Sequence, residues 1–221
     1  MLKSITQEVH NLIGTKADIE ALAKKEHARV LVLSDTHGHY GLMEQIVRRY
    51  GKDCDALGFC GDGAGDLAML LFNSQKDKDL KASIPPVIAF VQGNGDPASY
   101  PLASGGSLII PESQVLTVNG RNLMFVHGHR EGIDFGLDNY GLEMQVSNCK
   151  VGFFGHTHNA YEENLDGFKF VNPGSVGRPR GGQPNSFAIA TVEKNFVDVN
   201  YIKVGINLNG EKDFQSWIPI Y

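Results

Sequence analysis

The sequence predicts an α/β fold, in which a parallel sheet is accompanied by a second sheet or extended into one large mixed sheet. Three observations predict this fold. Short, almost continuous apolar runs recur from Arg29 to about residue 154, which is typical of strands covered on both faces. Helix-like segments separate the first three runs. After about residue 160 only strand-like segments follow.

The expected core strands are five apolar runs, at residues 30–33, 56–60, 87–91, 123–126 and 151–154. Residues 41–50 and 66–72, between the first three runs, have the apolar spacing of helices. This part of the chain therefore predicts parallel strands joined by helical crossovers. Alternating or β-branched segments between Gly, Pro and Asn turns predict three further strands, at residues 168–171, 186–192 and 197–204.

Both ends of the chain carry apolar patterns. Apolar side chains three or four residues apart predict an amphipathic helix or helix pair over residues 1 to about 26, with Gly14 as a break. This helix is expected to pack on the chain's own domain or to dock a partner subunit. The last segment is too apolar for a free tail, so it docks on the core or forms an interface; either end could support a homo-oligomer. The expected parts are an N-terminal helical extension at 1–27, a central domain at 28–204 and a C-terminal segment at 205–221.

Composition narrows the class of protein. The 221 residues carry a formal charge of -5, so there is no global positive field for nucleic acid, which is not an expected partner. Cys54, Cys60 and Cys149 are odd in number and form no Cys-x-x-Cys pair, which argues against a disulfide framework and a thiolate zinc site. Neither a secretion signal nor an 18-residue apolar span is recognisable, so we expect a cytoplasmic protein without a membrane partner.

Each of the five core runs ends in a polar cluster. The clusters are Ser34 to His39, Gly61-Asp62-Gly63, Gly93 to Asp96, His127-Gly128-His129 and Gly155 to His158. Because the carboxyl ends of parallel strands line one edge of a sheet, the clusters are expected to converge on one crevice. Six of the 8 histidines form three His-x-His pairs, and residues two apart in an extended segment point the same way. Imidazole and carboxylate ligands without thiolate favour zinc, manganese, iron or nickel.

Each cluster alone also has an ordinary structural explanation. Asp35 could cap the helix that follows it. Residues 61–66 lack the Gly-Lys-Ser/Thr ending of a phosphate loop and carry Asp66 where a dinucleotide motif needs glycine, so we reject that interpretation. Asn94-Gly95 and Asn172-Pro173-Gly174-Ser175 are turn sequences. The functional interpretation therefore depends on the order of the clusters and their shared position after strands.

In this order the five clusters resemble the signature of the calcineurin-like metallophosphoesterase superfamily, over residues 30 to about 180. With Asn172-Pro173-Gly174-Ser175 and Arg180, the chain looks closest to its small bacterial and archaeal phosphodiesterase branch. The resemblance implies an α-β-β-α sandwich of two mixed sheets. It also implies a metal-dependent phosphodiesterase with two divalent ions, manganese first and zinc, iron or nickel as alternatives.

The resemblance further implies a role for each ligand. Asp35, His37 and His158 would hold one metal, while Asn94, His127 and His156 hold the other and Asp62 bridges them. A hydroxide that bridges the two metals would then attack the phosphorus of a small phosphodiester substrate.

The chain departs from the superfamily at Gly95, where many members have a histidine that protonates the leaving group and the closest branch often has cysteine. Without that acid we expect a preference for good leaving groups, as in aryl or nucleotidyl phosphodiesters. His39 and His129 are candidate substitutes, or else hydrogen-bond donors behind the ligands. The predicted catalytic residues are therefore His39, Asn94, Asp96 and His129.

Two arginines and three other functions complete the expectations. Arg130 and Arg180 could each bind a substrate phosphate through a bidentate fork, or be solvated loop residues.

A phosphomonoesterase or dinucleoside polyphosphate hydrolase is the alternative enzyme. A non-catalytic assembly scaffold, like a eukaryotic retromer subunit that resembles these enzymes, is the alternative class. A DNA nuclease ranks third, since the acidic chain has no aromatic and basic stretch for strand binding.

Overall fold

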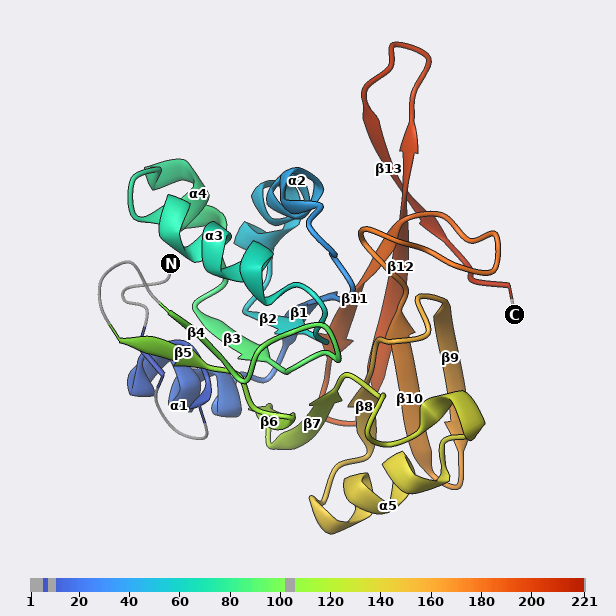
Figure 1. The fold of residues 1–221 in the computed structure, drawn as a ribbon. Coiled ribbons are helices and arrows are strands. Elements are labelled where there is room, and N and C mark those ends of the chain that lie inside the picture. Colours follow the sequence, from blue (N-terminus) through green and yellow to red (C-terminus); the bar gives the residue numbers. More distant parts are fainter. Residues whose placement is uncertain (1–5, 8–10, 102–105, 221) are drawn as a thin grey trace.

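Two mixed sheets pack face to face in the computed structural model, which describes residues 6–7, 11–101 and 106–220. The larger sheet has the order β13-β12-β11-β1-β2-β3 and the smaller one the order β6-β7-β8-β10-β9. Helices α2, α3 and α4 lie on the outer side of the larger sheet, and α5 lies beyond the smaller one (Figure 1). The fold is therefore the α-β-β-α sandwich that the resemblance implies.

The strands of the larger sheet are β1 (Ala28–Leu33), β2 (Ala56–Phe59), β3 (Val87–Phe90), β11 (Ser186–Val192), β12 (Val197–Ile206) and β13 (Lys212–Trp217). Those of the smaller sheet are β6 (Ser113–Val118), β7 (Arg121–Val126), β8 (Val151–Phe153), β9 (Ala160–Leu165) and β10 (Phe168–Pro173). A separate ribbon pairs β4 (Ser99–Pro101) with β5 (Ser107–Ile109). The helices are α1 (Lys16–Lys24), α2 (Tyr40–Tyr50), α3 (Ala64–Ser74), α4 (Lys78–Ser83) and α5 (Asp138–Val146), with short 3₁₀ turns at Gly51–Asp53 and Ile133–Phe135.

Period-two alternation along the central strands separates the core into layers. On β1, Leu31 and Leu33 face the helices, whereas Val30 and Val32 face the smaller sheet. Phe125 of the smaller sheet packs into the same space between the sheets. Burial on both faces explains why these strands read as continuous apolar runs.

Strand pairing sets the edge on which the site forms. β1, β2 and β3 are parallel, and the register places Leu33 opposite Phe59 and Phe59 opposite Phe90, so the three strands end level with one another. β7 and β8 are also parallel, with Phe125 opposite Phe153. The five predicted core strands are all present, as are the two predicted helices and the three later strands.

The N-terminal helix is present, over part of the predicted span. Within the described residues the helix begins only at Lys16, and Ile13 instead forms an isolated bridge to Ile88, with both backbone N–H groups donating across it (3.0 and 2.8 Å). Gly14 has φ +146°, and a Cβ there would lie 2.7 Å from the Pro86 carbonyl oxygen. Leu12 and Ile13, just before Gly14, are therefore buried in the core without belonging to an α-helix. Residues 1–5 and 8–10 of the predicted helix lie outside the described residues.

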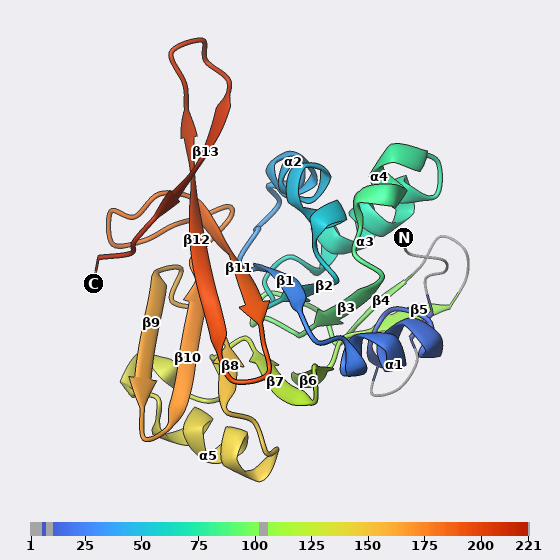
Figure 2. The ribbon, with the colours of Figure 1, turned by 180° about the vertical axis from the view of Figure 1, so that it is seen from behind.

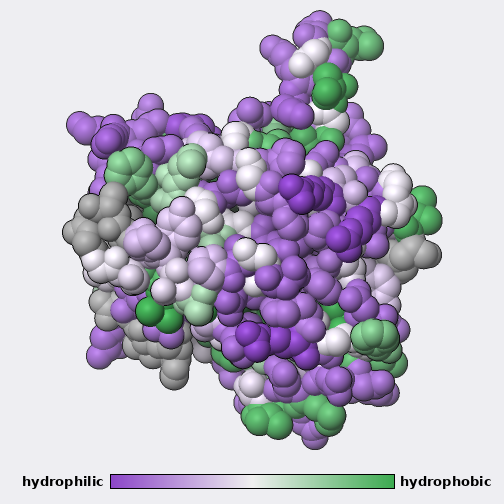
Figure 3. Space-filling view, in the orientation of Figure 1, coloured by the Kyte–Doolittle hydropathy of each residue, from purple (hydrophilic) through white to green (hydrophobic). Residues whose placement is uncertain are grey.

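The C-terminal segment extends the larger sheet. β13 pairs with β12 in a hairpin that projects from the body of the molecule (Figures 1 and 2). Near the body, the ring of Phe214 packs against those of Tyr50 and Phe187, with centroids 5.8 and 6.2 Å apart. At the far end Leu208 is fully exposed, and Figure 3 shows apolar side chains gathered there. No helix in the described part of the chain has the length and apolarity that a bilayer span requires.

Candidate metal centre

The seven candidate ligands follow five strand ends that meet at the seam between the sheets. Those from the larger sheet are Asp35 and His37 after β1, Asp62 after β2 and Asn94 after β3; those from the smaller sheet are His127 after β7 and His156 and His158 after β8. The convergence predicted from the strand ends is therefore confirmed, although two sheets contribute to it.

One group of side chains surrounds His158. Its Nδ1–H donates to the Arg178 carbonyl (2.6 Å), which leaves the lone pair of Nε2 facing Asp35 Oδ1 and His37 Nε2, each 3.1 Å away. Asp35 Oδ1 is buried and accepts no hydrogen bond in the described structure. Ligand atoms of these three residues and of Asp62 lie within 4.8 Å of one another. Lone pairs that converge at this distance repel unless a proton or a cation lies among them, so the group fits a cation.

A second group surrounds Asn94. Its Oδ1 lies 3.1 Å from His127 Nε2 and 3.0 Å from His156 Nδ1. The other nitrogen of each ring already carries the proton, because His127 Nδ1 donates to the Cys60 carbonyl (2.7 Å) and His156 Nε2 faces the Asp134 carboxylate (3.0 Å). Three lone pairs therefore converge here as well, which fits a second cation.

Asp62 joins the two groups. Its Oδ2 lies 3.6 Å from His37 Nε2 and 3.7 Å from His127 Nε2, between the two histidines. Its Oδ1 accepts the backbone N–H of Gly95 at 2.7 Å, which fixes the rotation of the carboxylate. This is the place that a bridging ligand would occupy.

Burial and charge act oppositely on the histidines of the first group. Burial lowers the pKa of His37, against the opposing charges of Asp35 and Asp62. Burial alone would also lower the pKa of His158, but the negative charge of Asp35, 3.1 Å from Nε2, and the carbonyl of Arg178 raise it overall. A neutral His37 suits metal binding, since a metal competes with the proton for the imidazole nitrogen.

Five of the candidate ligands have a left-handed backbone conformation, which is unusual for residues other than glycine. Left-handed φ values occur at Asp35 (53°), His37 (44°), Asp62 (56°), His156 (66°) and His158 (60°). Asp and His tolerate this region better than most residues, but each instance costs on the order of 1–3 kcal/mol. Five such turns directly after strand ends indicate a site in which precise side-chain placement outweighs local strain.

The family model of the calcineurin-like phosphoesterase superfamily domain matches residues 29–195. The chain belongs to this superfamily. It is similar to the probable metallophosphoesterase YsnB of Bacillus subtilis, with 29% identity over 174 residues that cover 78% of this chain and 89% of that protein.

Solved structures show the same fold. A predicted phosphoesterase from Streptococcus pneumoniae superposes with a TM-score of 0.62 at 22% identity, covering 87% of this chain and 99% of the other. Vacuolar Protein Sorting 29 from Cryptosporidium parvum superposes with a TM-score of 0.65 at 16% identity, covering 87% and 98%. At these identities the likeness concerns the sandwich alone.

The His-x-His pairs do not all behave as the sequence suggests. His37 and Gly38 both have positive φ (44° and 85°), so this segment is not extended. His39 instead hydrogen bonds through Nδ1 to the Thr36 carbonyl (3.0 Å) at the start of α2. This contact fits the alternative in which His39 is a hydrogen-bond donor behind the ligands. Capping by Asp35 is wrong, because the N-cap of α2 is His39 and has no side-chain cap.

His129 stays beside the centre. Its ring lies 5.3 Å from that of His127 and 6.1 Å from that of His156, and its buried Nδ1 has no hydrogen-bond partner among the described residues. Burial lowers the pKa of His129, and the neighbouring His127, Arg130 and His156 lower it further. His129 therefore lies beside the second group, in surroundings that favour the neutral imidazole.

Asp96 holds the backbone of the site. Its two carboxylate oxygens accept the N–H groups of Asp62 (2.7 Å), Gly63 (3.0 Å), Ala64 (2.8 Å) and Gly93 (3.0 Å). These bonds occupy both oxygens and tie the loop of Asp62 to the start of α3. Asp96 therefore holds the backbone around Asp62 in place.

Side chains of the Asn172-Pro173-Gly174-Ser175 segment hydrogen bond to two of the loops that carry ligands. Asn172 Nδ2 donates to the Gly155 carbonyl (2.8 Å) and Thr157 Oγ1 (3.1 Å), and Ser175 Oγ donates to the Asp35 carbonyl (2.8 Å). Both side chains are fully buried. Asn172 and Pro173 are the last residues of β10, so the segment is a strand end and not the turn that its composition indicates, and the ligand loops hydrogen bond to it.

The arginines differ in their surroundings. Arg130 forms an exposed ion pair with Glu112 (3.0 Å), whereas the backbone N–H of Arg180 donates to the His158 carbonyl (3.2 Å) and its side chain is exposed. Arg178 was not predicted, yet its charge contributes, after burial, to the lowered pKa of His37. Asp134 was also missed, since a lone aspartate in a loop carries no motif. Arg178 could have been found from its place three residues after Ser175.

Proposed function

We propose that this chain is a phosphodiesterase that uses two divalent metal ions, manganese first, held by the seven candidate ligands. The observation that carries the proposal is the pair of lone-pair clusters joined by Asp62 Oδ2, 3.6 Å from His37 Nε2 and 3.7 Å from His127 Nε2. Two ions in such a site activate water toward phosphorus and neutralise the phosphoryl oxygens.

The chain's own residues supply positioning and charge. The Asp62 carboxylate between the two ligand groups lowers the repulsion between dications, which a neutral amide could not do equally well. The Arg178 and Arg180 guanidinium groups, both exposed beside the His158 loop, are the proposed phosphate contacts. Arg130 is less suited, because Glu112 already pairs with it.

Proton supply limits the range of substrates. Gly95 has no side chain, and the lowered pKa of His129 leaves few protonated imidazoles at neutral pH. A leaving group that departs as an anion needs no proton, so aryl and nucleotidyl phosphodiesters are the proposed substrates.

Metal content and turnover test the proposal together. Purified protein is assayed by elemental analysis, then with bis(p-nitrophenyl) phosphate and p-nitrophenyl phosphate in added Mn²⁺, Zn²⁺, Fe²⁺ or Ni²⁺. We expect bound metal and faster hydrolysis of the diester, both lost in Asp62→Asn and kept in Asp198→Asn, whose side chain is exposed on β12. Preference for the monoester would favour the phosphomonoesterase, and full turnover by Asp62→Asn would remove Asp62 from the site.

A specific observation favours a second candidate, an assembly scaffold. The hairpin end exposes Leu208 completely and Ile206 by 69%, and apolar side chains in such positions commonly mark interfaces. Light scattering of the wild-type chain and of Leu208→Lys tests this. A scaffold would show a mass that falls in the variant and no turnover with any of the four metals.

A further inference from the structure

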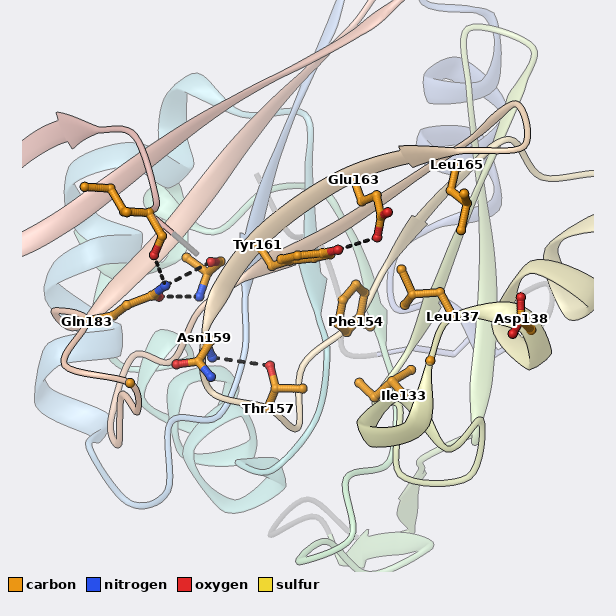
Figure 4. A pocket seen from close by; sticks show the side chains of 14 residues that line it. Ile133, Leu137, Asp138, Phe154, Thr157, Asn159, Tyr161, Glu163, Leu165 and Gln183 are labelled. Carbon is orange, nitrogen blue, oxygen red and sulfur yellow. Dashed lines mark hydrogen bonds between the residues drawn. The ribbon is translucent and has the colours of Figure 1, made fainter.

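A cavity of about 620 Å³ adjoins the candidate metal centre. Thr157, on its wall, lies between the ligands His156 and His158 in the chain. Ile133, on the opposite wall, precedes Asp134, whose carboxylate bonds to His156. Figure 4 shows Thr157 and Ile133 at the same end of the cavity. None of the seven candidate ligands lines the cavity, so it meets the centre only through these chain neighbours, and a group attached to a phosphate at the centre is the part of a substrate that can reach it.

The walls of the cavity are mainly apolar and aromatic. The rings of Phe154 and Tyr161 lie edge to face, with centroids 6.5 Å apart. Leu137, Leu165 and Ile220 of the C-terminal segment also line the cavity, and Figure 4 shows Leu137 between Leu165 and Ile133. Pockets of about 300–1,000 Å³ with such walls bind small organic groups, and planar rings stack well on aromatic side chains.

The polar groups of the cavity exclude a second phosphate. Asp138 and Glu163 are its charged residues, and no Lys, Arg or His belongs to its described lining. The carboxamide of Asn159 has no hydrogen-bond partner in the described structure, and its Oδ1 is buried. A polyphosphate chain would meet two carboxylates here. A neutral ring with an amino group would instead meet hydrogen-bond acceptors.

On the basis of the proposed function, we propose that this cavity binds the nucleobase of a nucleotidyl phosphodiester whose phosphate lies at the metal centre. The base packs against the ring of Tyr161, and Glu163 accepts a hydrogen bond from its exocyclic amino group. This assigns the organic part of the substrate and argues against the dinucleoside polyphosphate alternative, whose extra phosphates have no cationic partner in the cavity.

Two substrates with the same leaving group test the assignment. They are adenosine 5′-(p-nitrophenyl phosphate) and methyl p-nitrophenyl phosphate. Loss of a stacked base typically raises KM by about tenfold or more, so Tyr161→Ala should do this for the adenosyl ester and leave the methyl ester unchanged. Tyr161→Phe keeps the ring and should retain the wild-type KM. Phe196→Ala removes an exposed ring in the β11–β12 turn, outside the cavity, and should change neither substrate.

Saturation-transfer NMR with adenosine alone separates this proposal from the proposed function, because it needs no turnover. We expect transfer to the base protons in the wild-type chain and in Phe196→Ala, and its loss in Tyr161→Ala, with circular dichroism confirming that the variant is folded. If no phosphodiester is hydrolysed, the proposed function fails while this measurement still decides the cavity. Equal transfer to all three proteins, or an equal effect of Tyr161→Ala on both esters, would overturn the cavity assignment.

Discussion

Individual carboxylates near the metal centre have different tasks, and Asp96 shows the difference. It serves four backbone N–H groups around Asp62 and Gly93. In Asp96→Asn the amide nitrogen faces these donors, so we expect about 10- to 100-fold weaker metal binding and a loss of roughly 1–3 kcal/mol in unfolding free energy. Metal titration and urea denaturation measure both. Asp198→Asn is the matched control, and equal behaviour of the two variants would contradict the positioning role.

Gly95 makes the lack of a proton donor testable. A Cβ at Gly95 would lie 3.2 Å from Asp62 Oδ1, so a side chain fits after a small shift and starts beside the bridge. Gly95→His should raise the rate on alkyl leaving groups by about 10²-fold or more and leave p-nitrophenyl leaving groups nearly unchanged. Gly41→His, on α2 with open space around it, is the control. An unchanged rate on the alkyl esters would show that the missing acid is not limiting.

Glu131 provides a pH test away from the ligand set. The residue is only 5% exposed, its Oε2 has no hydrogen-bond partner among the described residues, and burial raises the pKa of its carboxyl. The folded state binds the proton of Glu131 more tightly than the unfolded state does, so protonated Glu131 stabilises the fold. This stabilisation is complete below the unfolded pKa of about 4.5 and is lost as pH rises through the folded pKa. Denaturation of Glu131→Gln should therefore show a smaller loss of stability between pH 4.5 and 8 than the wild type. Parallel pH profiles would refute this.

At the scale of elements, strands were recognised from sequence where both faces are buried. β1, β2 and β3 have this property and read as apolar runs. β6 alternates between buried and less buried positions and includes Ser113 and Gln114, so it gives no run. α5 was also missed, because it buries only Tyr140 and Met144 and contains Gly141. Elements without a distinct apolar pattern need tertiary context to be identified.

The ligand residues were recognised because each directly follows a strand, but their orientations were not. His37 and Gly38 are left-handed, so the segment is not extended, and His39 Nδ1 bonds to the Thr36 carbonyl. Asp96 was expected among the catalytic residues, and no sequence pattern reveals that four backbone donors occupy it. Strand ends thus predict which residues meet, while backbone dihedrals decide which atoms do.

The N-terminal segment and the sheet form one packing unit through Ile13. This side chain is fully buried in the core beside the helices, and its backbone bonds to Ile88 of β3. Ile13→Ala should lower the unfolding free energy by about 2–4 kcal/mol, the usual cost of a buried cavity of this size. Ile206→Ala, 69% exposed at the hairpin end, should change it by less than about 0.5 kcal/mol. A neutral Ile13→Ala would mean that the segment contributes nothing to the core.

For the whole molecule, the site at the seam links metal binding to global stability. Asn94 comes from the larger sheet and His127 from the smaller one, so an ion between them is bound only when the sheets are packed. Metal at 100 times its Kd should add about 2.7 kcal/mol to the unfolding free energy. Calorimetry with Mn²⁺ or with EDTA measures this. The shift should vanish in Asp62→Asn, and a metal-independent melting temperature would show that no ion binds the folded state.

The left-handed backbone at five ligand positions has a further consequence. Valine, isoleucine and threonine fit that conformation poorly, whereas glycine adopts it freely. Replacing such a ligand by glycine therefore deletes its donor atom while preserving the loop shape, and asparagine in place of aspartate alters the donor without reshaping the turn. Only a few residue types are therefore expected at these positions in relatives of this chain. Through substitutions among them, a relative could lose its metal ligands and still keep the same loop shape and surface.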